Sequence, residues 1–210
     1  MPDYYARDLD TVEINNSFYR LPPSGTFEGW KKSTPPGFCF AVKASRYLTH
    51  QKKLLDPAPA LKRLLGAAVH LGSKLGPILF QLPPHWRCNL ERLSDFLRTL
   101  PPSHRYSLEC RNATWHTDEV YRLLEQHNVA FCLGGCMTPI EVTADFVYVR
   151  LHGPGNKYQG DYPTATLKAW CRRIRQWTRC DKDVYVYFDN DQAGYAIKNA
   201  MSLRAMVDGS

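Results

Sequence analysis

The chain alternates between short apolar runs and segments of helical periodicity, and this alternation restricts its fold more than any other feature. Seven runs are predicted as strands, over residues 11–15, 38–44, 76–82, 106–110, 129–133, 146–152 and 184–190. Each is nearly continuous in apolar residues, with little alternation between polar and apolar positions. Such runs are typical of parallel sheets that are covered on both faces.

Helical periodicity separates most of these runs. Apolar stripes predict helices over residues 61–71, 90–100 and 167–177, and Thr117 is a plausible N-cap for a helix that begins with Asp118 and Glu119. The connection over residues 134–145 shows no helical pattern. Repeated strand–helix units indicate a parallel sheet, either an open doubly wound sheet or a closed barrel.

The absence of nucleotide-binding motifs favours the barrel. No strand–GxGxxG–helix or P-loop pattern occurs, as an open nucleotide-binding sheet would require. A closed (β/α)₈ barrel has eight strands and typically about 250 residues, whereas this chain has seven predicted strands and 210 residues. It opens with YYARDLD, which reads as the tail of a helix. We therefore expect an α/β TIM-type barrel, a single domain over residues 1–210, with the first strand and most of the first helix absent.

Composition restricts the compartment more than the activity. No apolar run is long enough to span a bilayer, and MPDYYARDLD has neither the basic start nor the apolar stretch of a signal peptide. The seven cysteines include no C-x-x-C pair, and the nearest two are Cys132 and Cys136. Reduced thiols in a cytoplasmic protein are the expected state.

A formal net charge of +7 permits an anionic partner, such as a nucleic acid, a phosphate ester or an acidic sugar. The densest basic run, residues 171–179, lies on a predicted amphipathic helix whose apolar face is Leu167, Trp170, Cys171, Ile174 and Trp177. Its arginines therefore form either a solvated outer face or a nucleic-acid patch.

Polar side chains recur where the predicted strands end. In a parallel barrel the active site is built from these carboxyl ends and the loops after them. Residues two apart on a strand point to the same side, so the polar residues can face a common mouth. In chain order the candidates are Glu13, Asn15, Lys43, His50, Gln81, Glu109, Arg111, Arg150, His152, Asp189 and Asn190.

The pair Arg150 and His152 makes this arrangement specific. A cation within a buried strand requires a compensating charge. We expect Arg150 and His152 to meet Glu13, Glu109 and Asp189 at the mouth. A structural ion-pair layer that fills the barrel is the alternative, although clustered charges concentrate at functional sites.

The sequence is compatible with two further kinds of site, one for phosphate and one for a divalent metal. The glycine-rich loop over residues 152–160 and the segment 190–200, which leads into a helix, occupy positions that bind phosphate in many barrels. Glu13, Glu109, His152 and Asp189 are also of a type that binds divalent metals, but no local H-x-x-x-H or C-x-x-C spacing supports a metal. A metal-free site is preferred, and no cofactor is indicated.

Several long motifs occur in a recognisable order. They are EINNSFYRLP, FAVKASRYLTH, LGPILFQLPP, LECRNATW, ADFVYVRLHGP, YVYFDND and GYAIKNA. In this order they resemble the YecE-like family, domain of unknown function 72, over essentially the whole chain. The resemblance implies a TIM-type barrel and no reaction, because the activity of the family is not established.

The family motifs fall on many of the residues at the strand ends. They match Glu13, Asn15 and Tyr19 in the first segment, Lys43 and His50 in the second, Glu109, Arg111 and Trp115 in the fourth, and Arg150 and His152 in the sixth. Asp189 stands where the family commonly has Asn. A glycine-, serine- and tryptophan-bearing first strand, typical of the family, is absent here, which agrees with the expected missing strand.

Three functions are compatible with these residues. The first is an enzyme, or an enzyme-derived binder, that acts on a small anionic or sugar-like ligand at the mouth. Glu13 or Glu109 would be its general acid or base, and His50 or His152 its proton carrier. Ligand contacts would come from Asn15, Tyr19, Lys43, Gln81, Arg111, Trp115, Arg150, Tyr158, Asp189 and Asn190. The second is a nucleic-acid-binding or processing protein, and the third is an inactive truncated fragment.

Overall fold

A computed structural model describes residues 6–134, 140–155 and 158–209 of the chain. It contains seven strands, β1 (Thr11–Ile14), β2 (Cys39–Lys43), β3 (Leu75–Gln81), β4 (Tyr106–Glu109), β5 (Val129–Leu133), β6 (Phe146–Leu151) and β7 (Asp183–Phe188). They are ordered β1 to β7 in the sheet, and every neighbouring pair is parallel. Over the described residues, these seven parallel strands follow the strand order of a TIM-type barrel, so the predicted fold class is confirmed.

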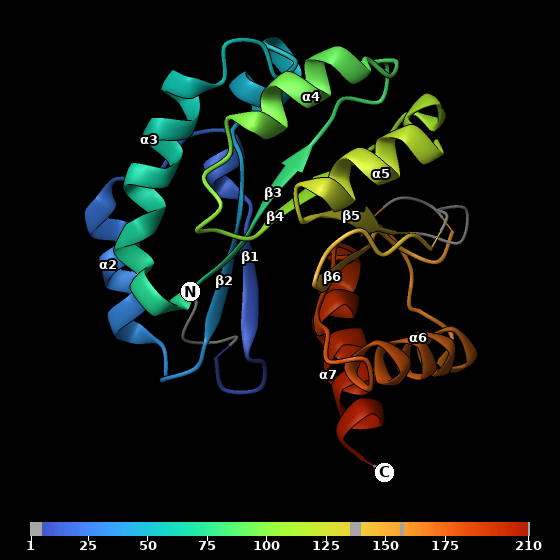
Figure 1. The fold of residues 1–210 in the computed structure, drawn as a ribbon. Helices are drawn as coiled ribbons and strands as arrows, with labels where there is room; N and C mark the ends of the chain where they lie inside the picture. Colours follow the sequence, from blue (N-terminus) through green and yellow to red (C-terminus); the bar gives the residue numbers. More distant parts are fainter. Residues whose placement is uncertain (1–5, 135–139, 156–157, 210) are drawn as a thin grey trace. The chain divides into compact units, whose positions relative to one another are not determined.

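Helices connect most of the strands, as the sequence predicts (Figure 1). They are α2 (Ser24–Ser33), α3 (Ala58–Ala68), α4 (Leu90–Arg98), α5 (Asp118–Gln126), α6 (Thr164–Thr178) and α7 (Tyr195–Asp208). The predicted cap of α5 is confirmed, because the Thr117 side chain accepts a hydrogen bond from the Val120 amide. The described residues between β5 and β6 form no helix, and residues 135–139 of this connection lie outside the description.

The chain divides into two compact units, Met1–Phe131 and Cys132–Ser210, with the boundary inside β5. Residues 129–131 of β5 pair with β4 in the first unit, and residues 132–133 pair with β6 in the second. The two are called unit 1 and unit 2 below. A single domain over residues 1–210 stays a prediction.

The register in unit 1 assigns the two faces of its strands. Glu13 is beside Ala41, Lys43 beside Leu79, and Gln81 beside Glu109. Residues in register on neighbouring parallel strands point to the same side, and alternate residues share a face. One face therefore carries polar groups toward the strand ends, while the other is apolar and buried, with Ile14, Phe40, Val42, Ile78, Phe80 and Leu108.

Helices α2 and α3 lie side by side along the strands of unit 1 (Figure 1). The 3₁₀ turn after α3, Val69–Lys74, packs against α2. Lys74 fastens this contact, because its Nζ donates hydrogen bonds to the carbonyls of Lys31 and Thr34 at the end of α2. A cation at these carbonyls also complements the helix dipole.

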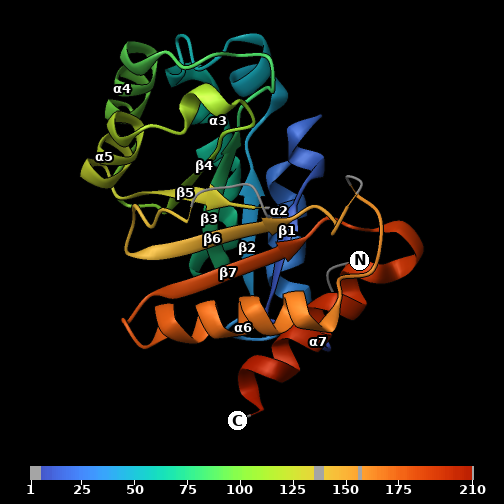
Figure 2. The same cartoon turned by 90° about the vertical axis from the view of Figure 1, so that its right-hand side faces the viewer.

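Unit 2 combines β6 and β7 with α6 and α7 (Figure 2). Every residue of β6 is buried, as expected for a strand covered on both faces. Helix α6 packs against α7 and β7 through its buried stripe of Leu167, Trp170, Cys171, Ile174 and Trp177. Arg175 of α6 donates to the Met206 carbonyl in the last turns of α7, which ties the two helices together.

The described cysteines are all free thiols, and Cys136 lies outside the described residues. Burial raises the pKa of the Cys110 thiol well above its usual value, and the neighbouring Glu109 carboxylate raises it further. Burial likewise raises the pKa of Cys88. Both shifts favour the protonated, unreactive form. Within residues 6–134, 140–155 and 158–209, no helix is both long and apolar enough to cross a membrane.

Candidate functional site

The polar face of unit 1 ends in a cluster of buried polar side chains. Glu13, Lys43, Gln81 and Glu109 come from β1, β2, β3 and β4, and each has less than a tenth of its surface exposed. The register places all four on one face near the carboxyl ends of their strands. This is the end at which parallel α/β folds place their active sites, as predicted.

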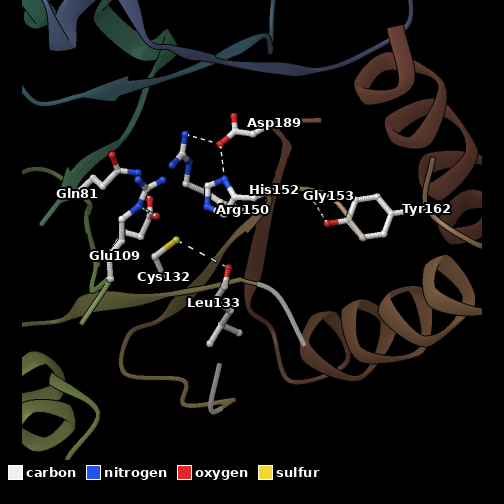
Figure 3. A network of polar contacts seen from close by, with 10 residues as sticks. Gln81, Glu109, Cys132, Leu133, Arg150, His152, Gly153, Tyr162 and Asp189 are labelled. Carbon is white, nitrogen blue, oxygen red and sulfur yellow. Dashed lines mark hydrogen bonds and ion pairs between the residues drawn. The ribbon is translucent and has the colours of Figure 1, made fainter. Parts of the chain in front are cut away.

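Glu109 is held by a separate donor at each carboxylate oxygen. Gln81 Nε2 donates to Oε2 at 2.7 Å, and Figure 3 shows the two side chains facing each other. Arg111 Nε donates to Oε1 at 3.0 Å. Hydrogen bonds to an ionised carboxylate are among the stronger polar contacts in proteins. The arrangement fixes Glu109 as an oriented anion and fixes Arg111 in turn.

Ser17 and Phe18, in the turn after β1, contact the end of β2. The Ser17 hydroxyl lies 3.0 Å from the Ile14 carbonyl and 2.7 Å from the Lys43 carbonyl, which ties the turn after β1 to the end of β2. The Lys43 ammonium lies 4.5 Å from the centre of the Phe18 ring. This cation–π contact orients the buried Lys43 side chain.

His50 approaches the same ring from the loop after β2. It lies in a single π-helical turn, Tyr47–Gln51, and its ring meets Phe18 edge-on at a centroid separation of 5.1 Å. Lys53, Leu54 and Asp56 follow with positive φ angles, which are unfavourable for residues other than glycine. Isolated π turns and strained backbone both concentrate at functional sites.

The surroundings favour the neutral form of His50. Its pKa is lowered first by burial and then by the positive charges of Arg46, Lys43 and Arg111, and Glu109 opposes them only in part. His50 Nδ1 lies 2.9 Å from the Thr49 hydroxyl, which lies 3.2 Å from the Ser45 carbonyl. Both contacts are satisfied when Thr49 donates to Ser45 and Nδ1–H donates to Thr49. Nε2 then carries the lone pair and can accept a proton.

Arg46 is the member of this cluster that the sequence analysis did not select. It is exposed, one residue before the π-helical turn. Its only signal was its place in the segment SRYLTH that precedes and includes His50. Three cations of unit 1, Lys43, Arg46 and Arg111, therefore act on one imidazole.

Three other predicted residues of unit 1, Asn15, Tyr19 and Trp115, differ widely in their exposure. Asn15 is exposed, and Tyr19 is 81% exposed. Trp115 is fully buried and donates its indole N–H to the Trp86 carbonyl at 2.8 Å. In this structure Trp115 has no surface to offer a ligand, because its ring packs edge-on against Trp86 inside the unit.

Unit 2 gathers the remaining charged candidates around one carboxylate. Arg150 Nη2 lies 2.7 Å and His152 Nδ1 lies 2.9 Å from the same oxygen of Asp189 (Figure 3). Both contacts are ion pairs by distance. Asp189 therefore supplies the compensating charge expected for Arg150. A common mouth with Glu13 and Glu109 stays a prediction.

The loops of unit 2 hold this ion-pair group in place. The Tyr158 ring meets His152 edge-on at 5.7 Å, and the Gly153 amide donates to the Tyr162 hydroxyl. Asn190 is fully buried and donates to the Gly160 carbonyl and to Asn199. The phosphate-binding role predicted for these loops stays a prediction, and residues 156–157 lie outside the description.

In the part of the chain that the structure describes, these side chains are not arranged to bind a metal ion. There, no group of three or more His, Cys, Asp and Glu side chains is arranged to hold a metal ion. Asp191 lies beside the ion-pair group in sequence, and burial together with the Asp189 carboxylate raises its pKa.

Comparison with known proteins gives a consistent result. The family model "Protein of unknown function DUF72" matches residues 3–210. The chain is 27% identical to UPF0759 protein YunF of Bacillus subtilis (strain 168), over 97% of this chain and 85% of that protein.

Solved structures share the fold. The DUF72 family protein TM1631 of Thermotoga maritima MSB8 superposes with a TM-score of 0.84 at 26% identity, over 98% of this chain and 87% of that chain. The DUF72 family protein EF0366 of Enterococcus faecalis V583 does so with a TM-score of 0.88 at 19% identity, over 100% of this chain and 89% of that chain. The chain therefore belongs to the DUF72 family of proteins of unknown function.

Proposed function

We propose that unit 1 carries the site of an enzyme, or an enzyme-derived binder, for a small anionic or sugar-like ligand. The observation that supports this most strongly is the set of Lys43, Arg46 and Arg111 around a neutral His50. A cation-rich site attracts anions. A neutral imidazole with an accessible lone pair can accept a proton from the same ligand.

Each residue then has a distinct role. Lys43 and Arg111 bind the anionic group, and Arg46 attracts it from the exposed rim. His50 Nε2 accepts or returns the proton. Glu109 is a positioning residue, because both of its oxygens are already occupied by Gln81 and Arg111. This assignment moves the acid–base role predicted for Glu109 to His50.

Thermal melts in inorganic phosphate test the anion site. A ligand that binds only the folded state stabilises it by about 2.7 kcal/mol at about 100 times its Kd, which corresponds to about 5–10 °C for a chain of this size. We expect phosphate to raise the Tm of the wild type and to raise that of Arg46→Gln much less. Arg63→Gln removes another exposed positive charge, on α3, and serves as the matched control.

The rise in Tm that phosphate causes in each variant shows whether phosphate binds near Arg46. Equal phosphate stabilisation of Arg46→Gln and Arg63→Gln would mean that phosphate binds elsewhere. No stabilisation of the wild type at any phosphate concentration would remove the anion site altogether.

Nucleic-acid binding is the second candidate, and one observation in unit 2 favours it. Helix α6 carries Lys168, Arg172, Arg173 and Arg175 and no acidic residue. Phosphate contacts of this kind produce an affinity that falls steeply as salt rises. Retention on single- or double-stranded DNA or RNA at low salt, lost in Arg172→Gln, would support this candidate. No retention at low salt would remove it.

A further inference from the structure

Tyr19 is the most exposed of the large hydrophobic side chains in the described part of the chain, with 81% of its surface accessible. It directly follows the 3₁₀ turn Asn16–Phe18 after β1. Single exposed aromatics are common on protein surfaces. This one differs because its ring contacts the candidate site.

Phe18 links Tyr19 to the chemical groups of unit 1. The Tyr19 and Phe18 rings meet edge-on with centroids 5.1 Å apart, and Phe18 meets His50 at the same separation. Two steps of 5.1 Å thus set the upper limit of the distance between the Tyr19 and His50 rings. The Lys43 ammonium also lies over Phe18. A hexose phosphate or a nucleoside phosphate is long enough to bridge Tyr19 and these groups.

The backbone that carries Tyr19 is fixed. The buried Ser17 hydroxyl contacts the carbonyls of both Ile14 and Lys43, and the Tyr19 amide donates to the Asn16 carbonyl at 3.1 Å. Tyrosine also loses little side-chain entropy when it is ordered, because it has only two χ angles. An exposed, pre-oriented aromatic ring beside a polar site is a suitable surface for stacking.

We infer that Tyr19 is a stacking platform, and that the ligand of the unit 1 site is a phosphate monoester whose organic part contains a sugar or nucleobase ring. This inference rests on the proposed anion site. Lys43, Arg46 and Arg111 bind the phosphoryl group, and the flat apolar face of the ring attached to it packs on Tyr19. The ring belongs to a sugar or to a nucleobase, since both present such a face to an aromatic side chain.

Binding measurements by calorimetry separate the ring from the phosphate. The probes are inorganic phosphate, glycerol 3-phosphate as a phosphate ester without a ring, glucose 6-phosphate and AMP. We expect at least one ring-bearing ester to bind the wild type about ten-fold more tightly than glycerol 3-phosphate. Tyr19→Ala should lose that advantage, and Tyr19→Phe should keep it.

Two comparisons make the result specific. Binding of glycerol 3-phosphate to Tyr19→Ala at wild-type affinity shows that the variant is folded and that the anion site is intact. Tyr195→Ala, which truncates a tyrosine at the start of α7 in unit 2, should leave all four affinities unchanged. Preference for glucose 6-phosphate would assign the ring to a sugar, and preference for AMP would assign it to a nucleobase.

The measurements can overturn the stacking role of Tyr19 and the anion site separately. Equal affinity for all three esters, or an equal loss for every probe in Tyr19→Ala, would overturn the stacking role while leaving the anion site in place. Failure of inorganic phosphate and of every ester to bind the wild type would overturn the proposed function, and the inference with it.

Discussion

The two units gather similar residues at their strand ends but arrange them differently. In unit 2, Asp189 accepts both Arg150 and His152 at one oxygen, so the charges compensate one another locally. In unit 1, each oxygen of Glu109 has its own donor, and the pKa of His50 is lowered by burial and by three cations. The ion-pair group of unit 2 has the features of a structural element. The cluster of unit 1 places Lys43, Arg46 and Arg111 around a partly exposed imidazole, and for this reason we propose the binding site there.

The largest difference between the units is expected in stability. Removing one partner of a buried ion pair costs about 3–5 kcal/mol, and this is the expected loss in Asp189→Ala. Glu109→Ala removes the ion-pair partner of Arg111 and the acceptor of the buried Gln81 amide, and it should cost less, about 1–3 kcal/mol, because Arg111 is more exposed than Arg150 and can be solvated. Urea unfolding of both variants measures the two losses.

Asp208→Ala is the control for these two variants. Its partner Arg204 is exposed, and surface ion pairs contribute at most about 1 kcal/mol. A loss in Asp189→Ala no larger than in Asp208→Ala would contradict the structural role of the ion-pair group in unit 2.

A smaller effect is expected in the pH dependence of stability. Because the pKa of His50 is lower in the folded state than in the unfolded chain, the unfolded chain binds more protons below the ordinary histidine pKa of about 6.5. This contribution to stability is complete above that pH and decreases as the pH falls toward the lower folded-state pKa. The wild type should therefore lose more stability than His50→Gln between about pH 7.5 and pH 5. Parallel curves for the two proteins in urea unfolding would argue against a perturbed His50.

The smallest effects are changes in the pKa of His50 itself. Arg46→Gln removes a cation, so the pKa should rise toward its ordinary value. Glu109→Gln removes the only opposing carboxylate among the charges that act on His50, so the pKa should fall further. NMR titration of the imidazole measures both changes. Shifts in the same direction in the two variants would show that long-range charge does not control this histidine.

The strands were predictable because each is a nearly continuous apolar run, and the seven predicted segments match β1 to β7 within a few residues. Helix α2 was not predicted. Its sequence SGTFEGWKKS has only Phe27 and Trp30 as apolar residues and includes two glycines, so it shows no helical stripe. Its position depends on tertiary contacts with the turn after α3.

The site was predictable by residue type but less so by role. Alternation along the strands selected Glu13, Lys43, Gln81 and Glu109, and they do share one face. It could not show that Gln81 and Arg111 occupy both oxygens of Glu109, since those partners come from a neighbouring strand and a loop. Nor could it show that Trp115 is fully buried, because a tryptophan in a loop motif reads equally well as a ligand contact or as core.

An NMR titration of all seven histidines, with and without inorganic phosphate, most directly tests whether the anion site lies in unit 1. Bound phosphate places negative charge beside His50, so we predict that its pKa rises. His152, already beside Asp189, and His127, just before the start of β5, should not respond. A response confined to His152, or equal shifts at all three histidines, would contradict the assignment of the binding site to unit 1.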